Sequence, residues 1–153
     1  MELFKSVFFT CHQENSTVTT QRISKQAQLL LGPSKSGRSS LLFELAFLYA
    51  DQGKSVLFIT PKVINTLPLL LAEREQPSVE TLDKIEIVYL ERKNELLEFT
   101  ASVHIKYKEP IDVFIVDDID HYYREEPKRS QLAAQAKVFA FVLDAVAFMN
   151  RLG

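Results

Sequence analysis

The sequence has little of what a disulfide-stapled, secreted or membrane-spanning protein needs. The single cysteine, Cys11, excludes an internal disulfide and a cysteine-based zinc cluster. The three histidines, His12, His104 and His121, lie far apart without metal-ligand spacing. No uninterrupted apolar run approaches the ~18 residues of a membrane span, and Met1 is not followed by the basic start and apolar stretch of a signal peptide. We therefore expect an intracellular protein in a reducing compartment, with no membrane partner.

A concentrated basic surface is also missing. The formal net charge is −2, and the 18 Lys and Arg residues are scattered among 20 Asp and Glu residues. A protein that holds nucleic acid by itself usually has a basic patch, because neutralising phosphates supplies most of its affinity. If DNA is involved, we expect a partner to make many of the contacts. The chain length and the 46% of hydrophobic residues suit one globular domain without staples.

Short, continuous apolar runs alternate with helical stretches along most of the chain. We expect buried strands at residues 28–31, 55–60, 84–90 and 113–116, and helices at 39–52, 62–75, 91–106 and 130–152. Gly53 lies where a helix C-terminus favours glycine, and Pro68 interrupts the second helix. Residues 73–83 and 120–130 are expected to be polar or charged connections. Apolar strands alternating with helices indicate an α/β fold with a mainly parallel sheet flanked by helices.

The regular pattern begins near residue 27. Residues 1–26 contain an apolar cluster, Leu3–Phe9, and a polar linker, whereas residues 27–153 form the α/β domain. The cluster predicts either a strand or an exposed docking segment. Because the expected sheet is small, we expect the natural protein to continue beyond residue 153 or another chain to complete the fold.

A phosphate-loop pattern joins the first strand of the α/β domain to its helix. Residues 32–39 read GPSKSGRS, which fits G-x-x-x-x-G-K-[ST] except that Arg38 replaces the lysine. In such loops backbone N–H groups converge on phosphate oxygens, the cation reaches the β- and γ-phosphates, and the hydroxyl ligates Mg²⁺. The predicted nucleotide-binding residues are Gly32, Ser34, Lys35, Ser36, Gly37, Arg38, Ser39 and Ser40.

Two alternatives stay open for this loop. The simpler interpretation is a Gly/Ser turn between strand and helix that meets no nucleotide. In addition, arginine keeps the charge but does not freely replace the compact lysine ammonium beneath the phosphates. Lys35, inside the loop, offers a second cation.

Asp117 follows directly after the apolar strand 113–116. P-loop proteins hold Mg²⁺ through an aspartate at such a strand end, beside the phosphate loop. Asp118 and Asp120 add negative charge there. A buried strand that ends in an Asp-rich turn is the simpler alternative. Taken with the loop, the pattern predicts Mg²⁺ at Ser39 and Asp117, with ATP as the nucleotide.

Several segments, in their order and spacing, resemble RecA-family recombinase paralogues, in particular the SWIM-domain-associated, ATPase-like subunits of Shu complexes. They cover about residues 28–152 and read LLLGPSKSGRSSLLFELA, GKSVLFIT, KIEIVYL, IDVFIVDDIDHYY and FVLDAVAFMNRLG. The resemblance implies a RecA-like P-loop core, cut short at its C-terminus, with nucleotide held at Gly32, Gly37, Arg38, Ser39 and Asp117.

The same resemblance implies a nuclear protein of homologous recombination repair. Such a subunit pairs obligately with a SWIM zinc-finger protein and promotes the assembly of a RecA-type recombinase on single-stranded DNA, which is contacted through the complex. Two departures bear on catalysis: Arg38 replaces the loop lysine, and Lys62 stands near the position of the water-activating glutamate. A cation cannot act as the general base for the attacking water. We therefore expect weak ATP binding, weak or absent hydrolysis and no catalytic residues. The alternatives are a small P-loop ATPase or kinase that tolerates Arg38, and a nucleotide-free α/β adaptor.

The final helix is apolar nearly all round from Val138 to Met149, with Asp144 as its one charge. Such a helix is either fully buried or covered by a second chain, and the resemblance favours a partner interface. The stretches 43–46 and 47–50 match the F-x-x-A element that joins recombinase protomers, although core packing is the favoured interpretation. Residues 121–124, HYYR, suit base stacking or, more simply, a capped turn.

Overall fold

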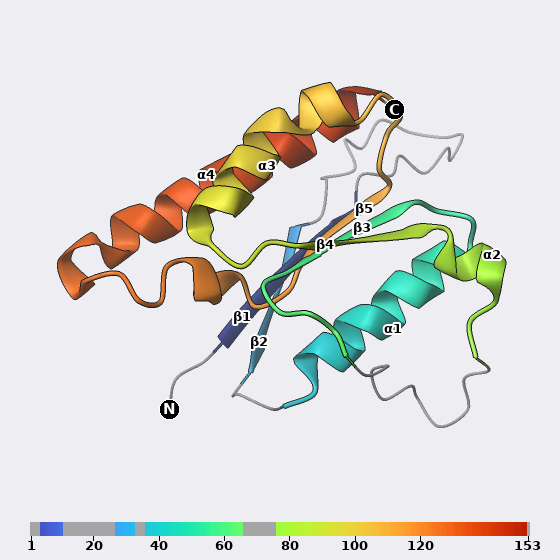
Figure 1. Cartoon of the computed structure of the whole chain (residues 1–153), viewed down its shortest axis with the longest axis horizontal. Coiled ribbons are helices and arrows are strands. Elements are labelled where there is room, and N and C mark those ends of the chain that lie inside the picture. The colour runs from blue at the N-terminus through green and yellow to red at the C-terminus, as the bar shows by residue number, and fades with distance from the viewer. Residues whose placement is uncertain (1–3, 11–26, 33–35, 66–75, 153) are drawn as a thin grey trace, which may run out of the picture.

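The computed structural model describes residues 4–10, 27–32, 36–65 and 76–152. Its elements in chain order are β1 (Phe4–Thr10), β2 (Ala27–Gly32), α1 (Arg38–Asp51), β3 (Val56–Thr60), α2 (Val79–Leu82), β4 (Ile85–Tyr89), α3 (Lys93–Lys106), β5 (Val113–Val116), the 3₁₀ helix η1 (Ile119–Tyr122) and α4 (Lys128–Leu152). The sheet lies between α1 on one face and α3 with α4 on the other (Figure 1). The expected α/β class is confirmed.

The five strands form one sheet in the order β2-β1-β5-β3-β4. β3 pairs in parallel with both β4 and β5. β1 runs antiparallel between β2 and β5, with Val7 opposite Leu29 on one side and Val116 on the other. Of the two interpretations of the N-terminal apolar cluster, the strand is correct for residues 4–10. β1 is hydrogen-bonded along both of its edges, so residues 4–10 are part of the sheet.

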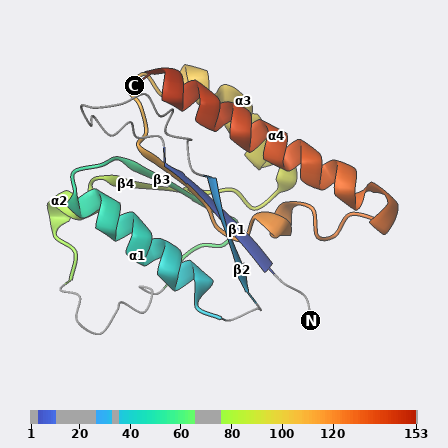
Figure 2. The same cartoon turned by 180° about the vertical axis from the view of Figure 1, so that it is seen from behind.

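Successive residues of β3 and β5 alternate between two hydrophobic cores, because side chains of a strand point to opposite faces in turn. The core beneath α1 receives Val56, Phe58, Val113 and Ile115. The core beneath α3 and α4 receives Leu57, Ile59, Phe114 and Val116. Figure 2 shows the same three layers from behind. Strands buried on both faces explain the continuous apolar runs in the sequence.

α1 positions the end of the phosphate loop against the sheet. It is preceded by Gly37 at φ 81°, a left-handed conformation that glycine adopts at no steric cost. Its last turn is closed by Gly53, whose N–H donates to the carbonyl of Ala50 over 2.8 Å. The buried face consists of Leu42, Phe43, Ala46, Phe47 and Ala50. Both F-x-x-A stretches therefore belong to the core, as the favoured interpretation predicts.

The structure differs from the prediction in two segments. A helix is predicted at 62–75, yet residues 62–65 are not helical, and 66–75 lie outside the described residues. The predicted polar connection 73–83 contains the short helix α2. Ser78 caps it by accepting a hydrogen bond from the N–H of Thr81 over 3.1 Å. The hydroxyl of Thr81 donates to Asp51 over 2.8 Å, which ties α2 to the end of α1.

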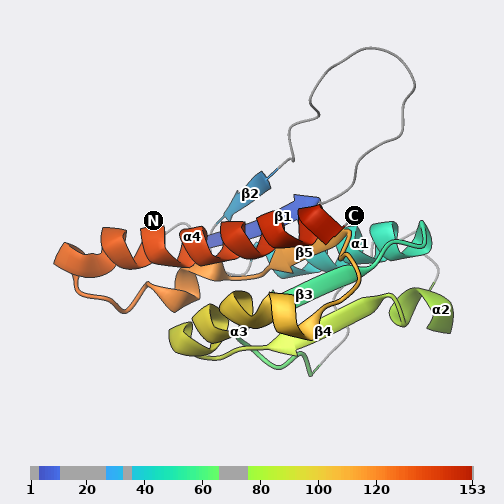
Figure 3. The same cartoon turned by 90° about the horizontal axis from the view of Figure 1, so that it is seen from above.

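α4 has one buried face and one exposed face, and α3 packs beside it (Figure 3). The buried face consists of Val138, Val142, Ala145, Val146 and Met149. The exposed face, here called the α4 outer face, consists of Leu132, Ala133, Ala136, Lys137, Ala140, Leu143, Asp144 and Ala147. By length and composition α4 also passes as a membrane span, with a mean hydropathy of 1.7 over 18 residues. Its buried row, packed against the sheet and α3, identifies it instead as a core helix that is covered on one side.

Candidate nucleotide site

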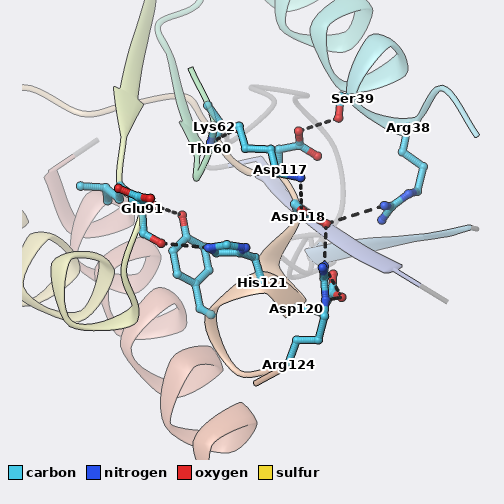
Figure 4. Close-up of polar contacts among 12 residues, drawn as sticks. Arg38, Ser39, Thr60, Lys62, Glu91, Asp117, Asp118, Asp120, His121 and Arg124 are labelled. Carbon is cyan, nitrogen blue, oxygen red and sulfur yellow. Dashed lines mark hydrogen bonds and ion pairs between the residues drawn. The ribbon is translucent and has the colours of Figure 1, made fainter. Parts of the chain in front are cut away.

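The phosphate-loop hydroxyl and the strand-end aspartate meet at the carboxyl edge of the sheet (Figure 4). The Ser39 hydroxyl donates to Oδ2 of Asp117 over 2.6 Å, although the two residues lie far apart in the sequence. Asp117 is 7% exposed, and its backbone N–H donates to the carbonyl of Ile59 over 2.8 Å. β3 and β5 therefore fix the aspartate, while the first turn of α1 brings the serine to it.

This oxygen pair fits Mg²⁺. The ion prefers oxygen ligands and is usually held by one or two protein groups together with water and substrate phosphates. Ser39 and Asp117 would supply the protein oxygens, and a bound Mg²⁺ would neutralise charge on the β- and γ-phosphates. The assignment of a metal to these residues stays a prediction.

The remaining loop residues are only partly described. Gly32 ends β2, Ser36 and Gly37 are exposed before α1, and Arg38 and Ser40 lie in its first turn. Ser34 and Lys35 lie outside the described residues. The idea that Lys35 supplies the cation in place of the missing lysine therefore stays a prediction.

Arg38 is directed towards a carboxylate that follows β5. Its side chain is 11% exposed, and its Nη2 lies 3.8 Å from Oδ1 of Asp118. Two further cations reach the same carboxylate: Nζ of Lys62 lies 3.7 Å from Oδ2, and Nη2 of Arg124 lies 3.3 Å from Oδ1. Asp118 is held at φ 52° and ψ 41°, a left-handed conformation in which aspartate is over-represented. The turn after β5 thus gathers cations from three separate segments of the chain.

Arg124 is the most firmly held of these cations. Its Nε and Nη2 donate to Oδ2 of Asp120 over 3.1 and 2.9 Å. Its backbone N–H donates to the Asp120 carbonyl over 2.8 Å. Arg124 therefore joins Asp118 and Asp120 into one rigid turn.

The local charges also shift acid–base behaviour. Burial raises the pKa of the Asp118 carboxyl, and the nearby Asp120 raises it further, against the lowering effect of Arg124 and Lys62. Burial, together with the charges of Asp117 and Asp118, raises the pKa of Tyr122. The Tyr122 hydroxyl therefore stays protonated at neutral pH and donates to the Leu90 carbonyl over 2.8 Å.

The HYYR stretch forms the capped turn rather than a base-stacking surface. Tyr122 and Tyr123 are 3% and 5% exposed, and both pack into the core beneath α3 and α4. Nε2 of His121 lies 2.9 Å from the carbonyl oxygen of Glu91. Stacking of bases on the two tyrosines is therefore wrong, because their rings are not accessible.

Two known proteins are similar in sequence to this chain. The ATPase SWSAP1 of Mus musculus is 34% identical over 127 residues, which cover 82% of this chain and 44% of the relative. The ATPase SWSAP1 of Homo sapiens is 31% identical over 127 residues, which cover 82% of this chain and 53% of the relative. Most of the chain is therefore similar to SWSAP1 proteins. The resemblance to RecA-like subunits of the Shu complex is thereby confirmed, and the chain spans about half the length of these curated relatives. No protein-family model and no solved structure matches it.

In this SWSAP1-like chain the sequence predicted Ser39 and Asp117 but missed the role of Asp118. The sequence pattern showed only that Asp118 and Asp120 crowd negative charge after the strand. Of the compensating cations, Arg124 lies in the same turn, whereas Arg38 and Lys62 come from α1 and from the segment after β3, and only the fold brings these two to Asp118. The sequence offered one signal for this ion-pair cluster, namely the number of basic residues that the predicted elements bring to the same edge of the sheet.

Proposed function

We propose that the chain is a RecA-like subunit of a Shu-type complex that acts in homologous recombination repair in the nucleus. Its role is to promote the assembly of a RecA-type recombinase on single-stranded DNA. The observation that carries the proposal is the similarity to SWSAP1 over 82% of the chain. The contact between Ser39 and Asp117 at the sheet edge supports a RecA-like ancestry of the site.

A SWIM zinc-finger protein is the proposed obligate partner, and the α4 outer face is the proposed contact. Leu132 and Leu143 on this face are 75% and 48% exposed. Exposed apolar surface on a helix favours association with another chain. The net charge of −2 supports contact with DNA through the complex rather than through this chain alone.

Nucleotide binding is proposed to be weak, with ATP and Mg²⁺ at the loop, and hydrolysis weak or absent. Arg38 and Lys62 both lie against Asp118, so phosphate groups must compete with a carboxylate for these cations. A catalytically active P-loop ATPase or kinase is the alternative, as is a nucleotide-free adaptor. The Ser39–Asp117 pair favours the nucleotide-binding proposals over the adaptor.

The proposed function is tested by reconstitution. The chain is co-expressed with a SWIM-domain protein, and the purified complex is added to a RecA-type recombinase on single-stranded DNA. Faster or more complete filament assembly, measured by fluorescence of labelled DNA, is the expected result. If a stable complex forms but filament assembly is unchanged, the proposed role in assembly is wrong.

Arg38→Lys should tighten the binding of Mg-ATP about tenfold, equivalent to ~1.4 kcal/mol. Lysine restores the one loop position that departs from the pattern, and its compact ammonium fits beneath the phosphates better than a planar guanidinium. Calorimetric titration of both forms measures the effect. Arg92→Lys is the control, because Arg92 is 78% exposed at the start of α3, and it should leave binding unchanged. Undetectable binding in both the wild type and the Arg38→Lys variant contradicts a nucleotide site.

Multiple-turnover hydrolysis should be negligible in the wild-type chain. A lysine at the expected glutamate position cannot accept the proton of an attacking water. Phosphate release at saturating Mg-ATP is measured for the wild type and for Asp117→Asn, which removes the proposed Mg²⁺ ligand. Turnover at ordinary enzyme rates, about 1 s⁻¹ or more, that Asp117→Asn abolishes supports the active-ATPase alternative instead.

A further inference from the structure

The three cations around Asp118 are not held equally. Arg124 makes hydrogen bonds of 2.9 and 3.1 Å to Asp120 and one of 3.3 Å to Asp118. Lys62 and Arg38 lie at 3.7 and 3.8 Å, beyond the usual hydrogen-bond distance. Arg124 therefore belongs to the turn itself, whereas the ion pairs of Lys62 and Arg38 with Asp118 are longer.

Carboxylates and cations lie close together at this edge of the described structure. Carboxylates at 117, 118 and 120 face cations at 38, 62 and 124. If Lys62 and Arg38 leave Asp118, Arg124 still neutralises part of the charge of the acidic turn. The turn can therefore remain in place when another anion takes the position of the Asp118 carboxylate between Lys62 and Arg38.

We propose that Lys62 is a phosphate-binding residue and that the terminal phosphate of a nucleoside triphosphate replaces Asp118 between Lys62 and Arg38. The inference rests on the proposed nucleotide site and extends it to a residue outside the loop. The Asp118 carboxylate lies within 3.8 Å of Arg38 Nη2 and within 3.7 Å of Lys62 Nζ, beside the Ser39–Asp117 pair. A doubly charged phosphate attracts these cations more strongly than a carboxylate does and accepts more hydrogen bonds.

Lys62 is suited to this exchange by its setting. Its side chain is 75% exposed at the end of β3, so that its flexible stem can redirect the ammonium without repacking the core. A cation at this position makes a contact that a nucleoside diphosphate lacks. The site is therefore selective for a triphosphate, and the residue that removes hydrolysis also retains the unhydrolysed nucleotide.

Calorimetric titrations with Mg-ATP and Mg-ADP test the role of Lys62. Lys62→Met keeps the length of the side chain and removes its charge. ATP binding is expected to weaken about tenfold, a loss of ~1.4 kcal/mol, while ADP binding stays within about twofold, ~0.4 kcal/mol. Lys106→Met is the matched control, because Lys106 is 48% exposed and pairs with Glu86 over 3.0 Å at the amino end of β4. An unchanged ratio of ATP to ADP affinity in Lys62→Met overturns the inference.

A second pair of variants tests the competition with Asp118. Asp118→Asn removes the carboxylate, and asparagine tolerates the left-handed backbone at this position. Its ATP binding should tighten about threefold or more, whereas Asp120→Asn, which removes a neighbouring charge, should have a smaller effect. Equal tightening in both variants shows only a general charge effect and overturns the exchange. If the wild type binds neither nucleotide, the proposal of a nucleotide site is wrong. If the wild type binds ATP and the Lys62 and Asp118 variants bind it equally well, only the exchange at Asp118 is wrong.

Discussion

Leu143→Asp should abolish co-purification with the proposed SWIM-domain partner while the chain remains folded. Leu143 is 48% exposed on the α4 outer face, so a charge there meets water in the free chain. In a complex the same charge would be buried without a counterion, which costs several kcal/mol. Circular dichroism reports the fold, and co-purification of the two chains reports the association.

The neighbouring residue gives a matched control for this result. Val142 is fully buried, so Val142→Asp should unfold the chain and lose the partner for that reason alone. Phe141 and Phe148 are poorer test positions, because both are partly buried and pack against the core beneath α3 and α4. If Leu143→Asp stays folded and still binds, the α4 outer face is not the interface.

Phe47→Ala should destabilise the chain by about 3–5 kcal/mol, the usual loss when a buried phenylalanine is truncated in a packed core. Phe47 is 3% exposed and packs in the core beneath α1. The adjacent Leu48 is 51% exposed, and Leu48→Ala should change stability by less than about 0.5 kcal/mol. Urea denaturation measures the free energy of unfolding of the variants.

The Phe47→Ala and Leu48→Ala variants also distinguish two roles of the F-x-x-A stretch, core packing and binding to a recombinase. If residues 47–50 joined the chain to a recombinase, Phe47→Ala would stay as stable as the wild type and lose only that partner. The core position of Phe47 predicts the opposite order, with loss of stability first. A stable Phe47→Ala variant that no longer binds the recombinase would contradict the core assignment.

The sequence predicted the elements whose patterns are local. β2, β3, β4 and β5 are short apolar runs with clear ends, and α1, α3 and α4 have helical periodicity over more than ten residues. The four-residue α2 was missed, because a single capped turn has no periodicity to detect. The position and direction of β1 were also missed. Which strands pair is decided by packing across the whole chain rather than by the strand's own residues.

The same distinction applies to the candidate site. Ser39 and Asp117 were predicted because each has a fixed place in a motif: Ser39 lies in the first turn of α1, and Asp117 follows β5. Their 2.6 Å contact follows because these helix and strand ends are adjacent. The ion pairs of Asp118 depend on three side chains that no motif places. Their geometry follows from the turn after β5 and from the path of the chain after β3. Such long-range electrostatic contacts require the folded arrangement.

The central place of β1 has a kinetic consequence. In the described sheet β2, the strand before the predicted phosphate loop, is joined to β5 only through β1. β5 is the strand before the acidic turn. The pairing of Val7 with Val116 connects residues on the order of a hundred positions apart, and contacts of such separation slow folding because a long loop must close first. During synthesis β1 can pair with β5 only after most of the chain has been made. We therefore expect the two halves of the proposed nucleotide site to come into register late in folding.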